Sequence, residues 1–385
     1  MESRKKALVF ILLLGCVSSF ADIAYEGARS VIGPYLSLLG ASGAIVGTVV
    51  GLGEFIGYSL RVIFGYWSDR TQKYWFITFL GYSINLIAVP LFAFAGNWQT
   101  ASLLLILERL GKAIRSPARD TILSYATKEV GRGWGFALHN SLDRVGAFLG
   151  PLMISLIFLF KQNYFLAFLS LSIPAFISLL ILGITRFFYP KPQEMEQAHL
   201  FKAEGLSKIY WIYLFSVGLI GAGYADFAFI AYHFEKTSIL SPFFIPLFYA
   251  VATGADGITT LFVSRIFDIK GIATLIWVTA LSSLFAPLVF LTGFWGSLLG
   301  IILWGIGIGS QETIMKAIVA IFVHPQKRAS AYGLLNLIFG SLWFLGSSAM
   351  GFLYDLSPLY VVIFSLVTQM ASLPLLFFVK AKSTT

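Results

Sequence analysis

Long apolar stretches separated by short polar segments dominate the pattern of the sequence. Each stretch reaches the roughly 20 helical residues needed to cross a bilayer core about 30 Å thick, so the pattern predicts membrane-spanning helices. Twelve such spans are predicted: 7–35, 42–67, 73–93, 99–124, 132–160, 164–188, 208–234, 241–267, 271–292, 295–322, 329–353 and 357–379. The expected fold class is therefore an all-α integral membrane protein with 12 transmembrane helices.

One connection is longer than the others and divides the spans into six and six. The stretch 189–207 is polar and contains two prolines. We therefore expect an N-terminal six-helix bundle over 1–189, a cytoplasmic linker over 190–207 and a C-terminal six-helix bundle over 208–385. The apolar run that begins at residue 7 after three basic residues resembles a signal peptide, but no small-residue cleavage site follows and charged residues continue the same span. We interpret it as the first span.

Composition and charge placement agree with a membrane location. Of the 385 residues 58% are hydrophobic and 12% are charged, whereas ordinary soluble domains carry about 25% charged residues. The net charge is +9, but 16 of the 27 Lys and Arg residues lie in predicted loops on the side of the N-terminus, against Lys161 and Lys236 on the opposite side. Positive loops mark the cytoplasmic side. The basic balance thus predicts cytoplasmic termini in a cell (inner or plasma) membrane, and no nucleic-acid partner.

The two halves of the sequence resemble each other at a nearly constant shift. A shift of 196 residues relates Gly111 to Gly307, Arg132 to Arg328, Asn140 to Asn336 and Gly150 to Gly346. Spans four and five therefore correspond to spans ten and eleven. This correspondence predicts a duplicated six-helix unit, with two pseudo-symmetric halves related by an axis normal to the membrane.

Three motifs resemble those of the major facilitator superfamily. The loop after span two, Gly65-Tyr66-Trp67-Ser68-Asp69-Arg70-Thr71-Gln72-Lys73, resembles the motif G-x-x-x-D-R-x-G-R, with Gln72 and Lys73 replacing its last glycine and arginine. Arg109-Leu110-Gly111-Lys112 is similar to a shortened R-x-x-x-G element in span four. Gly146-Ala147-Phe148-Leu149-Gly150-Pro151 resembles the core of the antiporter motif, although Ile154 and Ser155 stand where that motif has two glycines.

This resemblance implies a monomeric transporter that works by alternating access. It also implies that Gly65, Asp69, Arg70 and Lys73 form a conformational loop, in which Asp69 lies near the N-terminus of helix eleven around Ala329 and Ser330. The alternative is a solvated turn that carries positive-inside charge. Gly146 and Gly150, at small-xxx-small spacing, fit a helix contact as well as an exporter motif.

Charged residues inside the predicted spans are the candidate functional groups. A charge near the bilayer centre costs at least about 2.5 kcal/mol, so it should be paired or line a wet cavity. On span four, charges at spacings of four, three and four share one helical face. The candidates for the proton-coupling and substrate cavity are Asp22, Glu26, Glu54, Arg109, Lys112, Arg115, Asp143 and Arg144. The C-half cavity candidates are Asp226, Asp256 and Gln311.

These residues predict a secondary active transporter of a small solute, coupled to protons through Asp22, Glu54 and Asp143. The span-five motif favours export. Two alternatives stay open: proton-coupled uptake of an anionic metabolite, suggested by Lys112, Arg115 and Arg144, and a non-transporting receptor with a carrier fold, in which the charges are permanent ion pairs. We find no phosphate-binding loop, nucleophile motif or metal-ligand spacing, so we expect no enzyme activity, no metal and no cofactor beyond a proton gradient.

Overall fold

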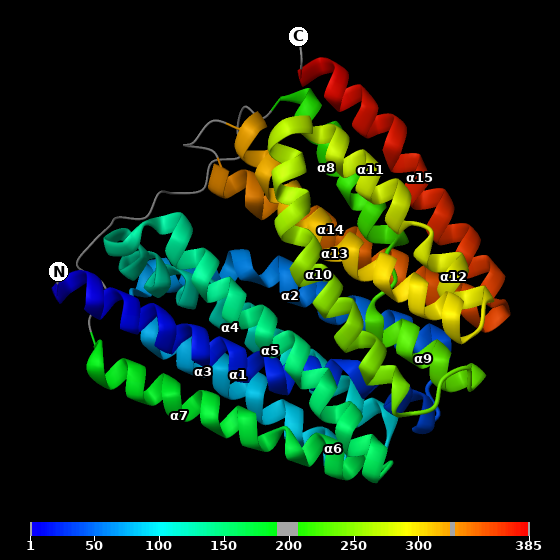
Figure 1. Cartoon of the computed structure of the whole chain (residues 1–385), viewed down its shortest axis with the longest axis horizontal. Helices are drawn as coiled ribbons and strands as arrows, with labels where there is room; N and C mark the ends of the chain where they lie inside the picture. Colours follow the sequence, from blue (N-terminus) through cyan, green and yellow to red (C-terminus); the bar gives the residue numbers. More distant parts are fainter. Residues whose placement is uncertain (1, 191–206, 324–327, 384–385) are drawn as a thin grey trace. The chain divides into compact units, whose positions relative to one another are not determined.

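Helices joined by short connections make up the described part of the chain in the computed structural model, which covers residues 2–190, 207–323 and 328–383. Figure 1 shows the elements in chain order. They are α1 (Glu2–Leu38), α2 (Gly43–Thr71), α3 (Tyr74–Leu91), the 3-10 helix η1 (Phe92–Phe94), α4 (Trp98–Val130), α5 (Arg132–Phe160), α6 (Tyr164–Ser170), α7 (Ser172–Phe188), α8 (Lys208–Gly223), α9 (Phe227–Thr237), α10 (Phe244–Lys270), α11 (Ile272–Ser282), α12 (Phe285–Leu291), α13 (Phe294–Phe322), α14 (Arg328–Leu356) and α15 (Pro358–Ser383). The predicted linker 190–207 lies almost entirely outside the described residues.

The helices follow the twelve predicted spans. Three predicted spans are each built from two consecutive helices, α6 with α7, α8 with α9 and α11 with α12. Within the described residues, ten helical segments are long and apolar enough to cross a membrane, and the bent helix α10 makes up to eleven. The one predicted span missing from that set is α4, whose interior carries the charges Glu108, Arg109, Lys112 and Arg115. The chain is thus an all-α integral membrane protein.

Helix packing divides the chain into two compact units. Unit 1 comprises Met1–Val31, Leu60–Ala198 and Pro242–Ala250, and unit 2 comprises Ile32–Ser59, His199–Ser241 and Val251–Thr385. The predicted domain boundaries at 189 and 208 are not tested by this division and stay a prediction.

In unit 1, α1 is held by small polar contacts and aromatic side chains. The Ser178 hydroxyl on α7 donates to the carbonyl of Val17 at 2.8 Å. Near the start of α1, Phe10 contacts Tyr189 with ring centroids 4.7 Å apart. Helices α3 and α4 pack along each other. These contacts place α1 and α4, the two helices with buried charges, inside the unit.

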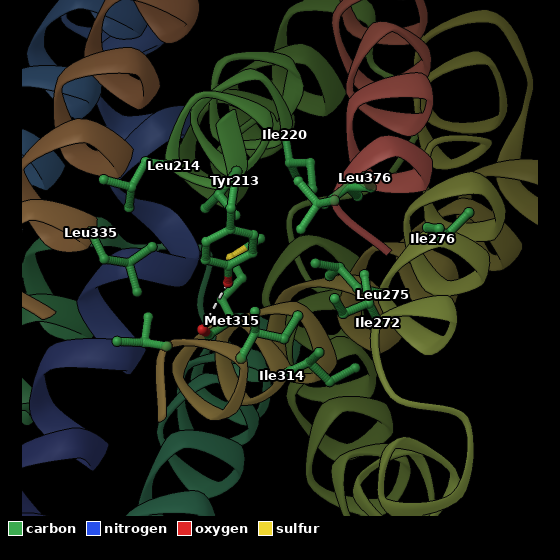
Figure 2. Close-up of a cluster of buried hydrophobic side chains, with 14 of the residues drawn as sticks. Tyr213, Leu214, Ile220, Ile272, Leu275, Ile276, Ile314, Met315, Leu335 and Leu376 are labelled. Atoms are coloured by element: carbon green, nitrogen blue, oxygen red, sulfur yellow. Dashed lines mark hydrogen bonds between the residues drawn. The ribbon is translucent and has the colours of Figure 1, made fainter. Parts of the chain in front are cut away.

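Unit 2 has a hydrophobic core that includes Tyr210 and Tyr213, and Figure 2 shows Tyr213 among the apolar side chains. Helix α8 packs against both α14 and α15. The Tyr213 hydroxyl donates to the carbonyl of Met315 on α13, and the Tyr210 hydroxyl donates to the carbonyl of Ala331 on α14, both at 2.8 Å. Because each buried hydroxyl has an acceptor, the core tolerates tyrosine without an unsatisfied donor.

Two glycines at equivalent positions of the internal repeat make equivalent helix contacts. A Cβ on Gly150 of α5 would lie 2.5 Å from the carbonyl oxygen of Ile23 on α1, inside unit 1. Inside unit 2, a Cβ on Gly346 of α14 would lie 2.0 Å from the carbonyl oxygen of Ala222 on α8. Neither position has room for a side chain. The two contacts are equivalent under shifts of 196 and 199 residues, as a duplicated six-helix unit requires.

The first turn of α2 is capped by a distant acid within unit 2. The backbone N–H groups of Gly43 and Ala44 donate to the carboxylate of Asp355, near the end of α14, at 2.8 and 2.9 Å. A carboxylate at a helix N-terminus satisfies exposed donors and complements the helix dipole. Asp355 therefore ties the start of α2 to the end of α14.

Candidate functional site

The charges of α4 lie against α1, α3 and α5 inside unit 1. Four of them, Glu108, Lys112, Arg115 and Arg119, follow the spacing predicted for one helical face. Glu108 accepts a hydrogen bond from the amide nitrogen of Asn85 on α3 at 2.6 Å, and the Nε of Arg109 lies 3.5 Å from Glu108. The stripe faces other helices, which is where intramembrane charges can be satisfied.

Arg115 is the centre of this stripe, and its guanidinium is only partly engaged. The residue is 1% exposed. Its Nη2 lies 3.8 Å from Oδ1 of Asp22, and its Cζ lies 4.2 Å from the ring centroid of Tyr82. Its Nε and Nη1 have no hydrogen-bond partner among the residues that the structure describes. Arg115 thus keeps donors that an anionic group could take.

Asp22 and Asp143 lie within electrostatic range of each other. Lys112, Arg115 and Glu26 also act on Asp22 at this range. Asp143 on α5 has its Oδ2 3.5 Å from Nδ1 of His139, while its Oδ1 is buried with no hydrogen-bond partner among the described residues. Like charges in range of each other disfavour simultaneous ionisation. The ionisation of Asp22 and that of Asp143 are therefore linked electrostatically.

The Ser18 hydroxyl connects His139, Tyr82 and Arg119. Ser18 Oγ lies 3.1 Å from Nε2 of His139 and 3.0 Å from the hydroxyl of Tyr82. Arg119 donates to the same oxygen at 3.1 Å and also binds Asp120 at 2.7 Å. Hydrogen bonds thus join His139, Ser18 and Tyr82, and Asp143 lies 3.5 Å from the other ring nitrogen of His139.

A second group of cations surrounds Tyr25. Arg29 and Arg109 both donate to its hydroxyl. The Nζ of Lys112 lies 3.8 Å from the centroid of its ring, which is a cation–π distance. Tyr25 is buried, so the ring partly replaces the water that these cations lose.

Three other N-half candidates are Glu26, Arg144 and Glu54. Glu26 accepts a hydrogen bond from the hydroxyl of Tyr249 at 2.6 Å and lies 4.0 Å from Nη1 of Arg29. Arg144 on α5 is partly buried. Glu54 is buried at 7% exposure and belongs to unit 2, and its predicted role stays a prediction.

The three C-half candidates have local partners inside unit 2. Asp226 caps α9, since its Oδ1 accepts from the backbone N–H of Ala228 at 2.8 Å. Asp256 accepts from the hydroxyl of Thr260 at 3.0 Å. The amide nitrogen of Gln311 donates to Ser282 at 3.1 Å and lies 3.4 Å from the Thr279 hydroxyl. Asp226 therefore has a structural role that the sequence pattern did not reveal.

The loop motif after α2 forms a compact turn. Oδ1 of Asp69 accepts from the Tyr74 hydroxyl at 3.1 Å, and Arg70 and Lys73 are exposed. Gln72, which stands where the motif has glycine, adopts a φ of 54°, in the left-handed region that glycine occupies easily. Its side chain compensates, because its amide donates to the Asp69 carbonyl at 2.6 Å.

The remaining predictions for the conformational loop concern Gly65 and the contact of Asp69 with helix eleven. A Cβ on Gly65 would meet Pro117 at 3.5 Å, an ordinary contact, so glycine is not required there for helix approach. The side chains of Ala329 and Ser330 lie outside the described residues. The predicted contact of Asp69 with that helix end stays a prediction.

The glycines of the span-five motif have a packing role. A Cβ on Gly146 would lie 2.2 Å from the carbonyl oxygen of Ser19 on α1, one turn from the Gly150 contact. Close approach of α5 to α1 accounts for both glycines, so the motif adds no support for export beyond the resemblance itself.

Several network residues were not predicted from the sequence. Ser18, Tyr25, Tyr82 and His139 were not among the candidates. His139 lies four residues before Asp143, so their helical spacing was a usable signal. Nothing in the sequence pattern marks Ser18, Tyr25 or Tyr82 among so many other hydroxyl and aromatic residues. Across the described ranges, no group of three or more His, Cys, Asp or Glu side chains could hold a metal ion.

Comparisons with known proteins agree with this architecture. Among solved structures, the nucleoside transporter NupG matches with a TM-score of 0.75 and 17% identity, over 97% of this chain and 98% of that one. A POT family transporter in complex with 5-aminolevulinic acid matches with a TM-score of 0.76 and 14% identity, over 97% and 96% of the two chains. At these identities the likeness shows the fold.

Sequence relatives extend the comparison. An uncharacterized protein of Mycobacterium tuberculosis is 33% identical over 379 residues, covering 96% of this chain and 93% of the relative. An uncharacterized MFS-type transporter of Methanocaldococcus jannaschii is 32% identical over 155 residues, or 40% of this chain and 39% of the relative. The family model of the Major Facilitator Superfamily matches residues 12–347. The chain therefore belongs to the Major Facilitator Superfamily and is a multi-pass membrane transporter.

Proposed function

We propose that this protein is a proton-coupled secondary active transporter, working by alternating access, whose small-molecule substrate carries an anionic group. The observation that carries the proposal is Arg115. It is buried, its contact with Asp22 is a loose 3.8 Å ion pair, and two of its guanidinium nitrogens have no hydrogen-bond partner among the described residues. A buried guanidinium with free donors is a site for a carboxylate or phosphate group.

The same geometry couples the anion to a proton. While Asp22 is ionised, it balances the charge of Arg115 and competes with any other anion for it. A proton on Asp22 removes this competitor and leaves Arg115 unbalanced, so the anion binds more tightly to the protonated form. By thermodynamic linkage, the bound anion in turn favours protonation of Asp22.

Asp143 and its neighbours provide a second position for the proton. Its charge acts on Asp22, and the hydrogen-bonded groups His139, Ser18 and Tyr82 lie alongside. We assign Asp22 and Asp143 to proton handling, and Arg115 and Lys112 to the anionic group. Glu26, which is bonded to Tyr249, is assigned to helix positioning.

This coupling sets the direction of transport. Because proton and anion load together, they move in the same direction, and an inward proton gradient drives uptake. Export in exchange for protons is the second candidate, and only the resemblance of the span-five motif to the antiporter motif favours it. Export requires a cationic substrate that competes with the proton for Asp22 or Asp143.

The setting proposed for this activity is a cell membrane, with both termini in the cytoplasm and a monomer as the working unit. Neither an enzymatic step nor a cofactor is part of the proposal. The energy source is the proton gradient.

The proposal is tested by recording internal pH in proteoliposomes that contain the purified full-length protein. Pools of small monocarboxylates, dicarboxylates and organic phosphates are added outside. We expect some anions to acidify the lumen, and Asp22→Asn to abolish the acidification while leaving exchange of the responding anion across the membrane. Asparagine keeps the shape of aspartate and removes the titrating group.

Asp268→Asn is the matched control, because Asp268 is an exposed carboxylate at the end of α10 in unit 2. It should transport like the unmodified protein. Alkalinisation by cationic solutes would instead support export. Folded, inserted protein that moves no solute in any pool would contradict transport and favour the receptor alternative.

A further inference from the structure

The hydroxyl of Ser18 has three polar neighbours inside unit 1. Its Oγ lies 3.1 Å from Nη1 of Arg119, 3.0 Å from the Tyr82 hydroxyl and 3.1 Å from Nε2 of His139. Ser18, Tyr82 and His139 are each at most 1% exposed. All four residues belong to unit 1. The hydrogens of these buried groups therefore have to be shared among the groups themselves.

The donors and acceptors at Ser18 allow two arrangements. A serine hydroxyl donates one hydrogen and accepts two, and an arginine only donates. Arg119 therefore takes one acceptor position of Ser18, and Ser18 donates to one of its other two neighbours and accepts from the other. Either Tyr82 donates to Ser18 and Ser18 donates to Nε2 of His139, or Nε2 donates to Ser18 and Ser18 donates to Tyr82.

The buried hydroxyl of Tyr82 distinguishes the two arrangements. Ser18 is its hydrogen-bond partner, and the described residues offer it no second one. In the second arrangement the Tyr82 O–H has no acceptor, which is costly for a buried donor. In the first arrangement each hydrogen on the Ser18 and Tyr82 hydroxyls has an acceptor. Nε2 of His139 then carries no hydrogen, so the ring is neutral and its hydrogen is on Nδ1.

Nδ1 of His139 faces the carboxylate of Asp143, one turn further along α5. Nδ1 lies 3.5 Å from Oδ2, just beyond hydrogen-bond distance, and neither Nδ1 nor Oδ1 of Asp143 has a hydrogen-bond partner among the described residues. Arg119 uses Nε and Nη2 on Asp120 and Nη1 on Ser18, so it acts on Asp143 through its charge. The charged groups in electrostatic range of Asp143 are Asp22, Lys112, Arg115, Arg119 and Asp120.

We propose that His139 is a positioning residue for the proton site, in which Ser18 fixes the ring tautomer and the Nδ1–H is held as the donor for the ionised carboxylate of Asp143. A neutral donor stabilises a carboxylate without adding a charge to the buried network. The inference rests on the proposed function where it gives Asp143 a role in proton handling. The tautomer of His139 does not depend on transport.

The tautomer is tested by ¹⁵N NMR of the full-length protein in lipid bilayers, with the label in histidine. The chain has four histidines, and the signals of His139 are those lost in His139→Gln. The two ring nitrogens give different signals in each tautomer. We expect the Nδ1–H tautomer to exceed the Nε2–H tautomer at least about tenfold, and Ser18→Ala to bring the ratio close to one. Excess of the Nε2–H form, an equal mixture, a doubly protonated ring or no effect of Ser18→Ala would overturn the proposal.

Two control variants isolate the bond to Ser18. Ser178→Ala also removes a buried hydroxyl that contacts α1, but its partner is the carbonyl of Val17. Asn140→Ala removes an exposed amide that also acts on the His139 ring. Both should leave the Nδ1–H tautomer in excess. Loss of this excess in either control would show that Ser18 is not what fixes the tautomer.

Two substitutions of His139 then separate the two sides of the ring in transport. An asparagine amide occupies about the position of Nδ1, and a glutamine amide occupies about that of Nε2. In the proteoliposome recordings we expect His139→Gln to lower the initial rate of acidification about tenfold, and His139→Asn to stay within about threefold of the unmodified protein. Equal rates in the two variants, or a larger loss in His139→Asn, would overturn the role of Nδ1.

The two measurements fail separately, because NMR needs no solute and no proton gradient. If acidification depends on Asp22 but His139 carries its hydrogen on Nε2, the positioning role alone fails. If the Nδ1–H tautomer is found but no solute moves protons, the proposed function fails and with it the role of His139 in proton handling.

Discussion

Arg115 and Gln311 occupy equivalent positions in the two halves of the repeat, yet they form different kinds of contact. In unit 1, Arg115 stacks on Tyr82 and pairs with Asp22. In unit 2, Gln311 donates to Ser282, whose position corresponds to Tyr82 at a shift of 200 residues. The repeat therefore conserves a polar contact between two helices while changing its charge.

The difference extends to the surroundings of each residue. Unit 1 brings carboxylates and cations together, whereas the core around Tyr210 and Tyr213 in unit 2 contains neutral hydrogen bonds from tyrosine hydroxyls to backbone carbonyls. The buried carboxylates Asp226 and Asp256 of unit 2 accept hydrogen bonds from a backbone N–H and a threonine hydroxyl. A neutral hydrogen bond cannot change its charge with proton binding. The comparison teaches that duplicated helices can keep the same packing while their polar contacts differ in charge.

The strongest challenge to this comparison is to make unit 1 resemble unit 2 through Arg115→Gln. The change removes the cation and leaves Asp22 buried without its partner, which costs about 2 kcal/mol or more in buried pairs. We expect anion-driven acidification to fall at least about 30-fold. Proteoliposome pH recordings measure this effect. Arg115→Lys should restore part of the activity, because it returns the charge without the planar donors; full activity of the glutamine variant would refute the ionic role.

A smaller effect is expected from Asp143→Asn. The substitution removes a carboxylate that acts on Asp22 and leaves the Asp22–Arg115 pair in place. We expect the initial rate of acidification to fall about tenfold, within the usual range of coupling between sites. If Asp143 and His139 act together, Asp143→Asn should lower the acidification rate of a His139→Gln variant only a little further. Additive losses would show that Asp143 acts without His139.

Gly150→Ala and Gly346→Ala test whether the two units pack in an equivalent way. In each variant a methyl group would meet a backbone carbonyl of the neighbouring helix, and overpacking of this kind typically costs about 1–3 kcal/mol. We expect similar decreases in thermal stability in detergent. Gly57→Ala is the control, because a Cβ there meets nothing within 4 Å. A loss at only one of the two glycines would limit the packing equivalence to a single unit.

The smallest effect should come from Tyr213→Phe in the core shown in Figure 2. Removing the hydroxyl leaves the Met315 carbonyl without this donor, which costs about 0.5–1.5 kcal/mol for a typical hydrogen bond. Thermal unfolding should register this loss, while the pH response in proteoliposomes stays unchanged. A change in coupling without loss of stability would mean that proton handling is not confined to unit 1.

Much of the fold was predictable, because each membrane-spanning helix needs a long run of apolar residues. Hydropathy and spacing located the spans, including the broken ones, and the shift of 196 residues anticipated the matched contacts of Gly150 and Gly346. The breaks inside spans were not predicted, because they depend on local helix caps such as Asp226. From the sequence alone, the Asp226 carboxylate is equally consistent with a residue that lines a cavity.

The candidate site was predictable only in part. The α4 stripe and its partner Asp22 followed from the cost of unpaired charge in a membrane. Ser18 and Tyr82 could not be recognised, because a hydroxyl becomes a network residue through contacts between distant segments: the bond from Ser18 to His139 joins residues 121 positions apart. Glu54 belongs to unit 2 and Asp22 to unit 1, so a shared role for these two residues stays a prediction.

The charges of α4 also bear on how the chain enters the bilayer during synthesis. Charged residues near a helix centre oppose translocon-mediated insertion by about 2.5–3.5 kcal/mol each, so α4 alone is a poor substrate for insertion. Helix α3 directly precedes it, and Asn85 of α3 donates to Glu108 of α4. We therefore expect helices α3 and α4 to enter the membrane together as a hairpin, so that the charged residues of α4, including the proposed anion ligand Arg115, depend on this neighbour from the start of insertion.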